Sequence, residues 1–459
     1  MIFSSIPFLF YFLPVVILLY FLAPEKLKNA VLLFSSLFFY AWGEPRFLVF
    51  MVVSILQGYV CGLLIERYSG SKRSKVILAV SVSFSLLLLG YCKYTDFFIT
   101  NFNALTGMSV PLLNIALPIG ISFYTFQILS YTVDVYRKNV PAQKNLIDFA
   151  AYAAMFPQLI AGPIVRYADI APQLKKRTHS IDEISLGIRR FVLGLTKKIL
   201  LANTLAQLVA IYKASNDKSL VFAWVYAIAY TLHVYFDFSG YSDMAIGLGH
   251  VFGFQFPENF DYPYISRSIT EFWRRWHMTL GSWFRDYLYI PLGGNRVSRP
   301  KWIFNILIVW MATGFWHGAS WNFILWGLYF AILLIFEKLW LLRKLPKRGI
   351  IPHLYVMFFV LLSFVFFDSP NVPAALATLG SMFGFAGLPF ISAETLYYLS
   401  SYAILILIGL LGSTPLPAKA AKKWFGESFL EPAVLLTLLA VCSAFLIDGS
   451  FNPFLYFRF

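Results

Sequence analysis

The chain has 459 residues, of which 59% are hydrophobic, 19% aromatic and only 13% charged, and its mean hydropathy is +0.70. Because soluble domains carry about 25% charged residues, too few polar side chains remain to cover a water-soluble body of this size. The composition excludes a soluble enzyme, a disordered chain and a secreted disulfide scaffold. It predicts an all-α polytopic integral membrane protein.

The charge of the chain is strongly positive and unevenly placed. Lys and Arg total 37 against 22 Asp and Glu, which gives a formal net charge of +15. These charges separate apolar segments, so they favour anchoring of cytoplasmic loops by the positive-inside bias over nucleic-acid binding. Lys and Arg number four in residues 66–75 and none in residues 369–397, and high and low counts alternate towards both ends of the chain. We therefore expect both the N-terminus and the C-terminus to be extracytoplasmic.

Apolar runs of membrane-spanning length recur along the whole chain and predict about 11–12 transmembrane helices. Two further apolar stretches, 149–165 and 244–256, are interrupted by Pro or Gly, and we expect re-entrant or half-depth helices there. The expected spans, in chain order, are Ile6–Ala23, Ala30–Trp42, Phe47–Ile65, Val76–Tyr91, Leu112–Val135, Phe191–Tyr212, Val221–Phe236, Ile303–Phe315, Trp321–Trp340, Pro352–Phe367, Leu399–Leu411 and Ala433–Ile447.

The middle of the chain has a different composition. From Phe254 to Lys301 it is too polar to span a membrane, yet it is rich in aromatic residues and arginine. This composition is typical of helices that lie at the membrane interface or dip below the headgroups, and counting spans places the block on the cytoplasmic side. No linker or repeat divides the chain. We expect one integral domain over residues 1–459, with N-terminal helices in 1–146, a catalytic core in 147–341 and C-terminal helices in 342–459.

His317 stands out among the six histidines on physical grounds. It lies in a glycine-flanked break between two predicted spans, within the string MATGFWHGASWNFILWG. Ionisable groups at membrane depth are costly and usually functional, and an imidazole in a site of low dielectric constant stays neutral and able to accept a proton. The alternative is a structural histidine that is satisfied by a backbone carbonyl group in a helix break.

Two other motifs carry ionisable groups and also have structural interpretations. His277, in WRRWH, fits an interfacial anchor in which arginines meet lipid phosphates and tryptophans form an aromatic belt. Asp237 and Asp243 lie six residues apart around a Ser-Gly pair, and we favour a broken helix capped by Ser239 and Asp243 over a catalytic pair of carboxylates. No GxSxG, HExxH, Walker or GxGxxG motif and no cluster of metal ligands is present, so no metal is expected.

Several long motifs resemble the membrane-bound O-acyltransferase (MBOAT) family. They are PIGISFYTFQILSYTVDVYR, FPQLIAGPIVRY, FDFSGYSDMAIGLGHVFGFQFPENFDYPYISRSITEFWRRWHMTLGSWFRDYLYIPLGGNR and GFWHGASWNFILWG. The resemblance covers nearly the whole chain. Within the family, the chain looks most like the bacterial alginate and peptidoglycan O-acetyltransferase branch. The teichoic-acid D-alanylation branch shares the motifs like WRRWH and WHG but usually differs around PLGGNR and WNF.

The resemblance implies the MBOAT fold, in which transmembrane, re-entrant and interfacial helices surround a central tunnel or funnel. It assigns the essential catalytic histidine to the WHG motif, here His317, and a second important histidine to WRRWH, here His277. The final residues, NPFLYFRF, are similar to a C-terminal motif in which a tyrosine, here Tyr456, is proposed to carry an acyl group in transit. The alternative for Tyr456 is an aromatic residue at the membrane interface.

The same motifs supply the candidates for substrate binding. We expect Arg274, Arg275 and Arg285 to dock an acyl donor and Asn322 to stabilise the oxyanion. The other substrate-binding candidates are Trp273, Trp276, Trp316, Asp237, Ser239 and Tyr241.

Together these features predict an O-acyltransferase of the bacterial cytoplasmic membrane. The expected substrate is a cytoplasmic acyl thioester, such as acetyl-CoA or a loaded acyl carrier protein, with no bound cofactor. An extracytoplasmic partner resembling SGNH hydrolases would place the acetyl group on alginate, peptidoglycan or another exopolysaccharide.

Three other functions remain open from the sequence. They are D-alanyl transfer to an acceptor of the teichoic-acid type, acylation of a lipid, and a transporter or channel with His317, Asp237 and Asp243 on its path. The transporter hypothesis predicts inverted-repeat symmetry, which the sequence lacks.

Overall fold

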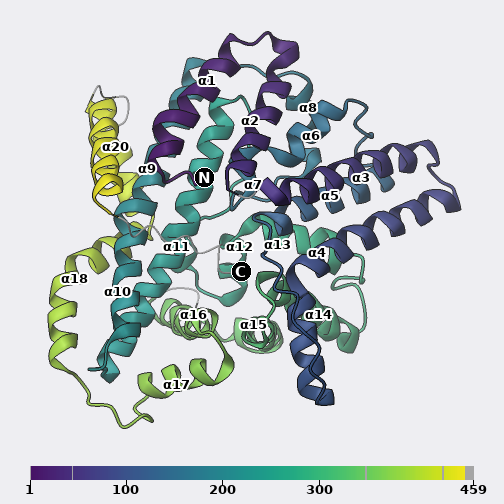
Figure 1. Ribbon diagram of the computed structural model, residues 1–459. Helices are drawn as coiled ribbons and strands as arrows, with labels where there is room; N and C mark the ends of the chain where they lie inside the picture. Colours follow the sequence, from purple (N-terminus) through teal and green to yellow (C-terminus); the bar gives the residue numbers. More distant parts are fainter. Residues whose placement is uncertain (1, 44, 347–348, 426–427, 429, 450–459) are drawn as a thin grey trace. The chain divides into compact units, whose positions relative to one another are not determined.

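The regular structure of the chain is entirely helical in the part that the structure describes (Figure 1). The computed structural model describes residues 2–43, 45–346, 349–425, 428 and 430–449. Helices satisfy every backbone donor and acceptor within one segment, so they are the form that an apolar chain of this composition can adopt in a membrane. The all-α prediction is confirmed.

Contacts between helices divide the chain into two compact units, and two helices, α9 and α11, each continue from one unit into the other. The first unit comprises Met1–Phe191 and Met244–Pro257. Its helices are η1 (Pro7–Phe12), α1 (Leu13–Leu22), η2 (Glu25–Leu27), α2 (Lys28–Gly43), η3 (Pro45–Phe47), α3 (Leu48–Arg67), α4 (Lys72–Thr106), α5 (Ile121–Tyr136), α6 (Leu146–Ala154), α7 (Phe156–Leu159), α8 (Tyr167–Lys175) and most of α9 (Ile181–Thr196).

The second unit comprises Val192–Asp243 and Glu258–Phe459 and contains both candidate catalytic histidines. Its helices are η4 (Lys197–Ala202), α10 (Asn203–Ala214), most of α11 (Leu220–Val251), η5 (Pro263–Ile265), α12 (Ile269–Arg275), α13 (Met278–Phe284), η6 (Arg285–Tyr289), α14 (Arg299–His317), α15 (Trp321–Leu339), η7 (Leu341–Arg343), α16 (Ile351–Asp368), α17 (Val372–Met382), α18 (Ala393–Gly412), α19 (Leu416–Phe425) and α20 (Leu430–Asp448).

Eight helices among the described residues are long and apolar enough to cross a membrane, and each covers one of the expected spans to within one residue. They are Pro45–Arg67, Lys72–Thr106, Ile181–Ala214, Leu220–Val251, Trp321–Leu339, Ile351–Asp368, Ala393–Gly412 and Leu430–Asp448. The other four expected spans correspond to Pro7–Leu22, α2, α5 and α14, which are shorter or less apolar. The first nine residues of the span expected over Leu112–Val135 precede α5 and are not helical. A short apolar helix, Val372–Met382, lies in a region expected to be a loop.

Two expectations about helix interruptions are wrong. The Ser-Gly pair after Asp237 does not break a helix, because α11 runs without interruption from Leu220 to Val251. A Cβ atom on Gly240 would lie 2.7 Å from the carbonyl oxygen of Gly194, so this glycine permits close packing against α9 and does not bend α11. The same helix contains most of the second interrupted stretch, 244–256, which therefore forms no separate half-depth helix.

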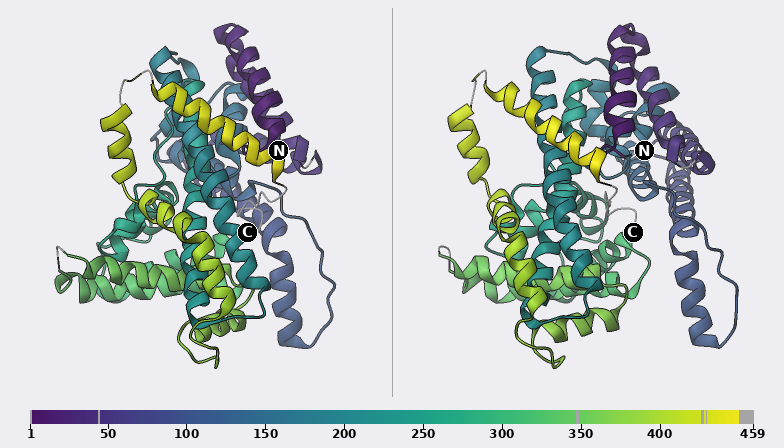
Figure 2. Two further views of the ribbon diagram at one scale, coloured as in Figure 1. Left: turned by 90° about the vertical axis from the view of Figure 1, so that its left-hand side faces the viewer. Right: turned by 60° about the vertical axis from the view of Figure 1, so that its left-hand side comes forward.

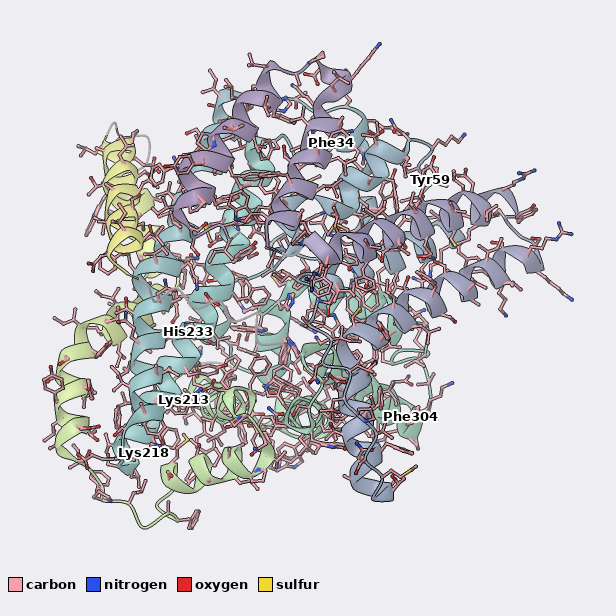
Figure 3. The ribbon with its side chains drawn as sticks, viewed as in Figure 1. Phe34, Tyr59, Lys213, Lys218, His233 and Phe304 are labelled. Atoms are coloured by element: carbon pink, nitrogen blue, oxygen red, sulfur yellow. The ribbon has the colours of Figure 1, made fainter. Side chains whose placement is uncertain are left out.

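α10 and the neighbouring part of α11 lie side by side within the second unit (Figures 1 and 2). The rings of Tyr212 and Tyr226 stack with their centroids 4.5 Å apart. Figure 3 labels His233 on α11. Its Nδ1 lies 2.9 Å from the carbonyl oxygen of Ala202. Next to this contact, Nζ of Lys198 lies 2.5 Å from Oδ1 of Asp237, and both side chains are almost completely buried. This ion pair fixes η4 against the centre of α11.

Candidate active site

His317 lies at the end of α14, where two glycines bring α14 and α15 very close together. A Cβ atom on Gly314 would lie 2.2 Å from the carbonyl oxygen of Phe323, and one on Gly327 would lie 2.2 Å from that of Trp310. No larger side chain fits between the two backbones at either position. The close hairpin fixes the position of His317 relative to both helices, and the glycine-flanked break predicted here is confirmed.

The His317 ring is enclosed by aromatic side chains. Its centroid lies 5.0 Å from that of Trp316, 5.1 Å from that of Trp326 and 5.4 Å from that of Phe367, each in an edge-to-face arrangement. The residue is 8% exposed. Aromatic walls of this kind fix the ring plane and keep the local dielectric constant low.

His277 lies between the short helices α12 and α13 in an unusual backbone conformation. Its φ angle is +45°, in the left-handed region that non-glycine residues rarely adopt. The backbone is held there because the N–H of Met278 donates to the carbonyl oxygen of Asn259 over 3.0 Å. Nδ1 of the ring lies 3.0 Å from Oδ1 of Asn259, whereas Nε2 is buried without a hydrogen-bond partner.

The two histidines share an aromatic neighbour. The ring of Trp316 lies 6.1 Å from that of His277 and 5.0 Å from that of His317, measured between centroids. Burial lowers the pKa of His277 well below its usual range, and the charge of the nearby His317 lowers this pKa further. Since a lowered pKa favours the uncharged form, His277 is neutral at physiological pH. One ring nitrogen then retains a lone pair that can accept a hydrogen bond.

A cavity of about 630 Å³ reaches His277. Its walls are largely apolar, with Trp273 and Trp310 among them, and Arg274, Arg285 and Lys338 add three cationic groups. Of the described side chains that line the cavity, none is Asp or Glu. The cavity therefore combines room for an apolar chain with a positive potential, which suits an extended ligand with anionic groups.

Four of the predicted site residues line this cavity, namely Trp273, Arg274, His277 and Arg285. Nε1 of Trp273 is buried and has no hydrogen-bond partner, so an indole N–H is left for a ligand. The Arg285 side chain is 61% exposed and pairs with Asp286 at 2.6 Å. His317 and the other candidates are not among the described residues that line the cavity.

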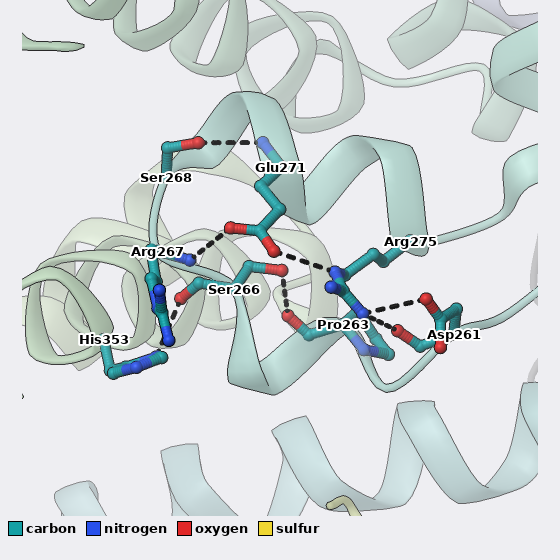
Figure 4. A network of polar contacts seen from close by, with 8 residues as sticks. All are labelled: Asp261, Pro263, Ser266, Arg267, Ser268, Glu271, Arg275 and His353. Carbon is teal, nitrogen blue, oxygen red and sulfur yellow. Dashed lines mark hydrogen bonds and ion pairs between the residues drawn. The ribbon is translucent and has the colours of Figure 1, made fainter. Parts of the chain in front are cut away.

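Arg275 belongs to a separate polar network (Figure 4). Its guanidinium group donates to Asp261 over 2.8 Å and to Glu271 over 3.0 Å. Glu271 in turn accepts from the backbone N–H of Arg267 over 2.9 Å. These contacts tie α12 to the segment before it, so Arg275 supports the site and does not project into the cavity.

The remaining tryptophans and Asn322 are buried beside the site. Trp276 packs against Phe272, with the ring centroids 5.6 Å apart, and Trp316 lies between the two histidine rings. The amide nitrogen of Asn322 donates to the carbonyl oxygen of Ser369 over 2.8 Å, and its side-chain oxygen accepts from Ser320. One Asn322 hydrogen is thus already engaged in holding α15 to the end of α16.

Asp237, Ser239 and Tyr241 lie on α11, where all three are buried. Asp237 is held by Lys198, and Asp243 accepts from Lys197 over 2.6 Å. Tyr456 lies outside the described residues. The geometry therefore brings together the WRRWH block, η6 and the hairpin of α14 and α15, and it leaves the α11 residues in the packed interior.

Most residues that line the cavity were not predicted from the sequence, and two of the missed residues at the site bear on its chemistry. Lys338 lines the cavity from the end of α15, and its only sequence signal is a single cation near the end of an apolar span. Asn259 holds His277, but a neutral amide in a loop has no charge or periodicity that would mark it. Among the described residues, no group of three His, Cys, Asp or Glu side chains could hold a metal ion.

The fold and this site define a multi-pass helical membrane protein with two buried histidines beside a cationic cavity. The chain belongs to the membrane-bound O-acyltransferase family, whose profile matches residues 34–368. It is therefore an O-acyltransferase that uses an acyl donor as substrate, which is the class that the sequence favoured over a transporter.

The chain is similar to several named acyltransferases. It is 39% identical to the probable alginate O-acetylase AlgI of Azotobacter vinelandii over the full length of both chains. It is 36% identical to the peptidoglycan O-acetyltransferase of Helicobacter pylori, over 84% of this chain and 80% of that protein. A more distant relative, the teichoic acid D-alanyltransferase of Bacillus subtilis, is 30% identical over 48% of this chain and 60% of that protein.

Proposed function

We propose that this protein passes an acetyl group from a cytoplasmic thioester across the bacterial cytoplasmic membrane for O-acetylation of an extracytoplasmic polysaccharide. The observation that carries the proposal is the cavity at His277, which combines apolar walls with three cations and lies in a family of acyltransferases. The full-length similarity to an alginate O-acetylase and the similarity to a peptidoglycan O-acetyltransferase support acetyl as the acyl group and a polysaccharide as the acceptor.

The acyl donor binds in the cavity with its anionic part against Arg274, Arg285 and Lys338. Acetyl-CoA fits this description because its phosphates are anionic and its pantetheine arm is long and narrow. Trp273 supplies a buried N–H that can donate a hydrogen bond to the thioester carbonyl oxygen, and Asn322 is the second candidate for this role. No bound cofactor is required for the transfer.

His317 acts as the general base. It takes the proton from an acceptor hydroxyl group, whose oxygen attacks the thioester carbonyl carbon. An O–C bond forms, the C–S bond breaks, and the proton passes from the imidazolium group to the leaving thiolate. General-base catalysis of this kind contributes typically about 10²–10⁴-fold to the rate.

The acyl group leaves on the extracytoplasmic side, where both termini lie. Tyr456 carries it as an ester before an SGNH-hydrolase-like partner transfers it to the polymer. Moving a neutral ester through the protein avoids the cost of moving a charged carrier through hydrocarbon. In this scheme residues 147–341 form the catalytic core of a single integral domain.

The proposal is tested by comparing the polymers of cells with and without the gene. Mass spectrometry of the cell wall and of the secreted polysaccharide should show the loss of O-acetyl esters from one polymer in cells that lack it. Restoration by the wild-type gene and not by a His317→Gln variant completes the test. Unchanged acetylation of every polymer would refute the proposed function, and loss of D-alanyl esters alone would replace it with the D-alanyl alternative.

The cationic lining of the cavity predicts a specific binding defect. Replacing Arg274 or Lys338 with glutamine should raise the KM for acetyl-CoA about tenfold with little change in kcat, because one charge-assisted hydrogen bond is worth about 1.5 kcal/mol. Acetyl transfer by the purified protein at several donor concentrations measures this. Lys344→Gln removes the same charge from an exposed site outside the cavity and is the matched control. An equal KM in all variants would mean that the donor binds elsewhere.

A further inference from the structure

The side-chain oxygen of Asn259 is surrounded by hydrogen-bond donors. It accepts from the hydroxyl group of Thr279 over 2.9 Å and from the backbone N–H of the same residue over 3.3 Å. Nδ1 of His277 lies 3.0 Å from the same oxygen. A backbone N–H can only donate, so it fixes which atom of the Asn259 amide is the oxygen.

This arrangement determines where the His277 ring carries its proton. An amide oxygen has no hydrogen to give, so Nδ1 must be the protonated nitrogen of the pair. In the neutral ring the other nitrogen, Nε2, then holds a lone pair and no hydrogen. Nε2 is buried without a hydrogen-bond partner, and the residue lines the cavity. A buried acceptor without a partner costs free energy unless a ligand supplies one.

We propose that Asn259 is a positioning residue that keeps the proton of the His277 ring on Nδ1, so that Nε2 accepts a hydrogen bond from a substrate N–H or O–H group. The inference rests on the proposed function, because the substrate is the one assigned there. Two sources share this chemistry: an amide N–H of the acyl donor's pantetheine arm, and the hydroxyl group of the acyl acceptor. His277 is then active only in its neutral form.

Charged groups surround the His277 ring on the helices that pack around it. His317 approaches from α14, and Arg274, Arg285 and Lys338 lie around the cavity on α12, η6 and α15. On α11, Phe238 packs edge-on against the ring with the centroids 4.7 Å apart, and the neighbouring Asp237 is neutralised by Lys198. Arg285 is paired with Asp286, and the charge of His317 opposes protonation of His277. A carboxylate at position 259 would instead favour the protonated form of His277 and raise its pKa.

Two substitutions of Asn259 separate positioning from simple structural support. Asn259→Leu keeps the side-chain volume but removes the oxygen that accepts from Nδ1, so the neutral His277 ring can carry its proton on Nε2 instead. We expect the rate of acetyl transfer to fall about 100-fold or more, since a protonated Nε2 cannot accept a hydrogen bond from the substrate. A fall in kcat identifies the acceptor hydroxyl group as the partner, and a rise in the donor KM identifies the pantetheine amide.

Asn259→Asp keeps the acceptor and adds a negative charge. It should retain activity at high pH and move the acidic limb of kcat/KM to higher pH by about one unit or more, because the charge favours the inactive imidazolium form.

Asn305 offers a matched control within the same unit. It is equally buried, and its side-chain nitrogen donates to the carbonyl oxygens of Leu292 and Gly294 over 3.2 and 3.1 Å. Asn305→Asp should leave the acidic limb where it is in the wild type. A wild-type transfer rate in Asn259→Leu, or an unmoved acidic limb in Asn259→Asp, would overturn the inference while leaving the proposed function intact.

A second readout does not depend on activity. Nitrogen-15 NMR of protein labelled at histidine distinguishes a protonated from an unprotonated ring nitrogen, and the His277 signals are assigned by their loss in His277→Gln. We expect an unprotonated Nε2 in the wild type and a mixed or reversed state in Asn259→Leu. A protonated Nε2 in the wild type would overturn the inference, whether or not acetyl transfer is observed. A wild-type protein that transfers no acyl group would instead contradict the proposed function.

Discussion

Replacing His317 with glutamine is expected to reduce acetyl transfer by about 10²–10⁴-fold while the protein remains folded and inserted. The imidazole is the group in the glycine-flanked hairpin that can accept a proton, and general-base catalysis contributes a factor of this size. Glutamine keeps most of the volume between Trp316, Trp326 and Phe367, so the aromatic packing survives. Acetyl transfer by the purified variant, with size-exclusion chromatography in detergent to confirm folding, measures the effect.

His353 provides the control for this substitution. It is a half-buried histidine of the same unit, and its Nδ1 lies 3.2 Å from the carbonyl oxygen of Ser266, away from the cavity. His353→Gln should keep most of the wild-type activity. Wild-type turnover in His317→Gln would remove His317 from the mechanism and would leave His277 as the histidine that accepts the proton.

Lys198→Met is expected to destabilise the protein by about 3–5 kcal/mol, because it leaves the Asp237 carboxylate buried without its cation. The two side chains are 0% and 1% exposed, so water cannot replace the lost partner. The double variant Lys198→Met with Asp237→Leu should recover most of this loss, since well-packed apolar groups often replace a buried ion pair without cost. Thermal unfolding in detergent measures the three variants against the wild type.

The adjacent pair supplies a matched control. Lys197 and Asp243 are separated by 2.6 Å, but their side chains are 31% and 18% exposed. The remaining Asp243 carboxylate is less completely buried than that of Asp237, so Lys197→Met should destabilise the protein less than Lys198→Met does. If Lys198→Met unfolds at the wild-type temperature, the buried pair is not what holds η4 against α11.

The apolar pattern predicted the helical class and eight of the spanning helices, because a helix that crosses lipid requires a long run of apolar residues, which the sequence shows directly. It did not predict their lengths. The helix expected over Val76–Tyr91 continues to Thr106 as part of α4, since the polar residues after Tyr91 are compatible with a helix that extends beyond the apolar layer. The other four expected spans lie wholly or in part on helices such as α2 and α5, which are apolar over fewer residues.

Candidate site residues could be named from the sequence where chemistry and spacing are visible in one short string, and their roles stay predictions. The motifs around His277 and His317 are of this kind. Asn259 was missed because its role arises from a chain reversal that places a loop amide against residues eighteen and twenty positions later. Gly240 was misread for a related reason: a glycine that admits a neighbouring backbone and a glycine that breaks a helix look the same in sequence.

The three cations around the cavity have a consequence for regulation. Arg274, Arg285 and Lys338 would contact the phosphorylated part of the carrier, which is the same before and after the acetyl group has left. Under the proposed function, spent carrier would compete with loaded carrier for this cavity. Polymer decoration would then follow the ratio of acetylated to free coenzyme in the cell, so the surface of the bacterium would reflect its carbon supply without any dedicated sensor.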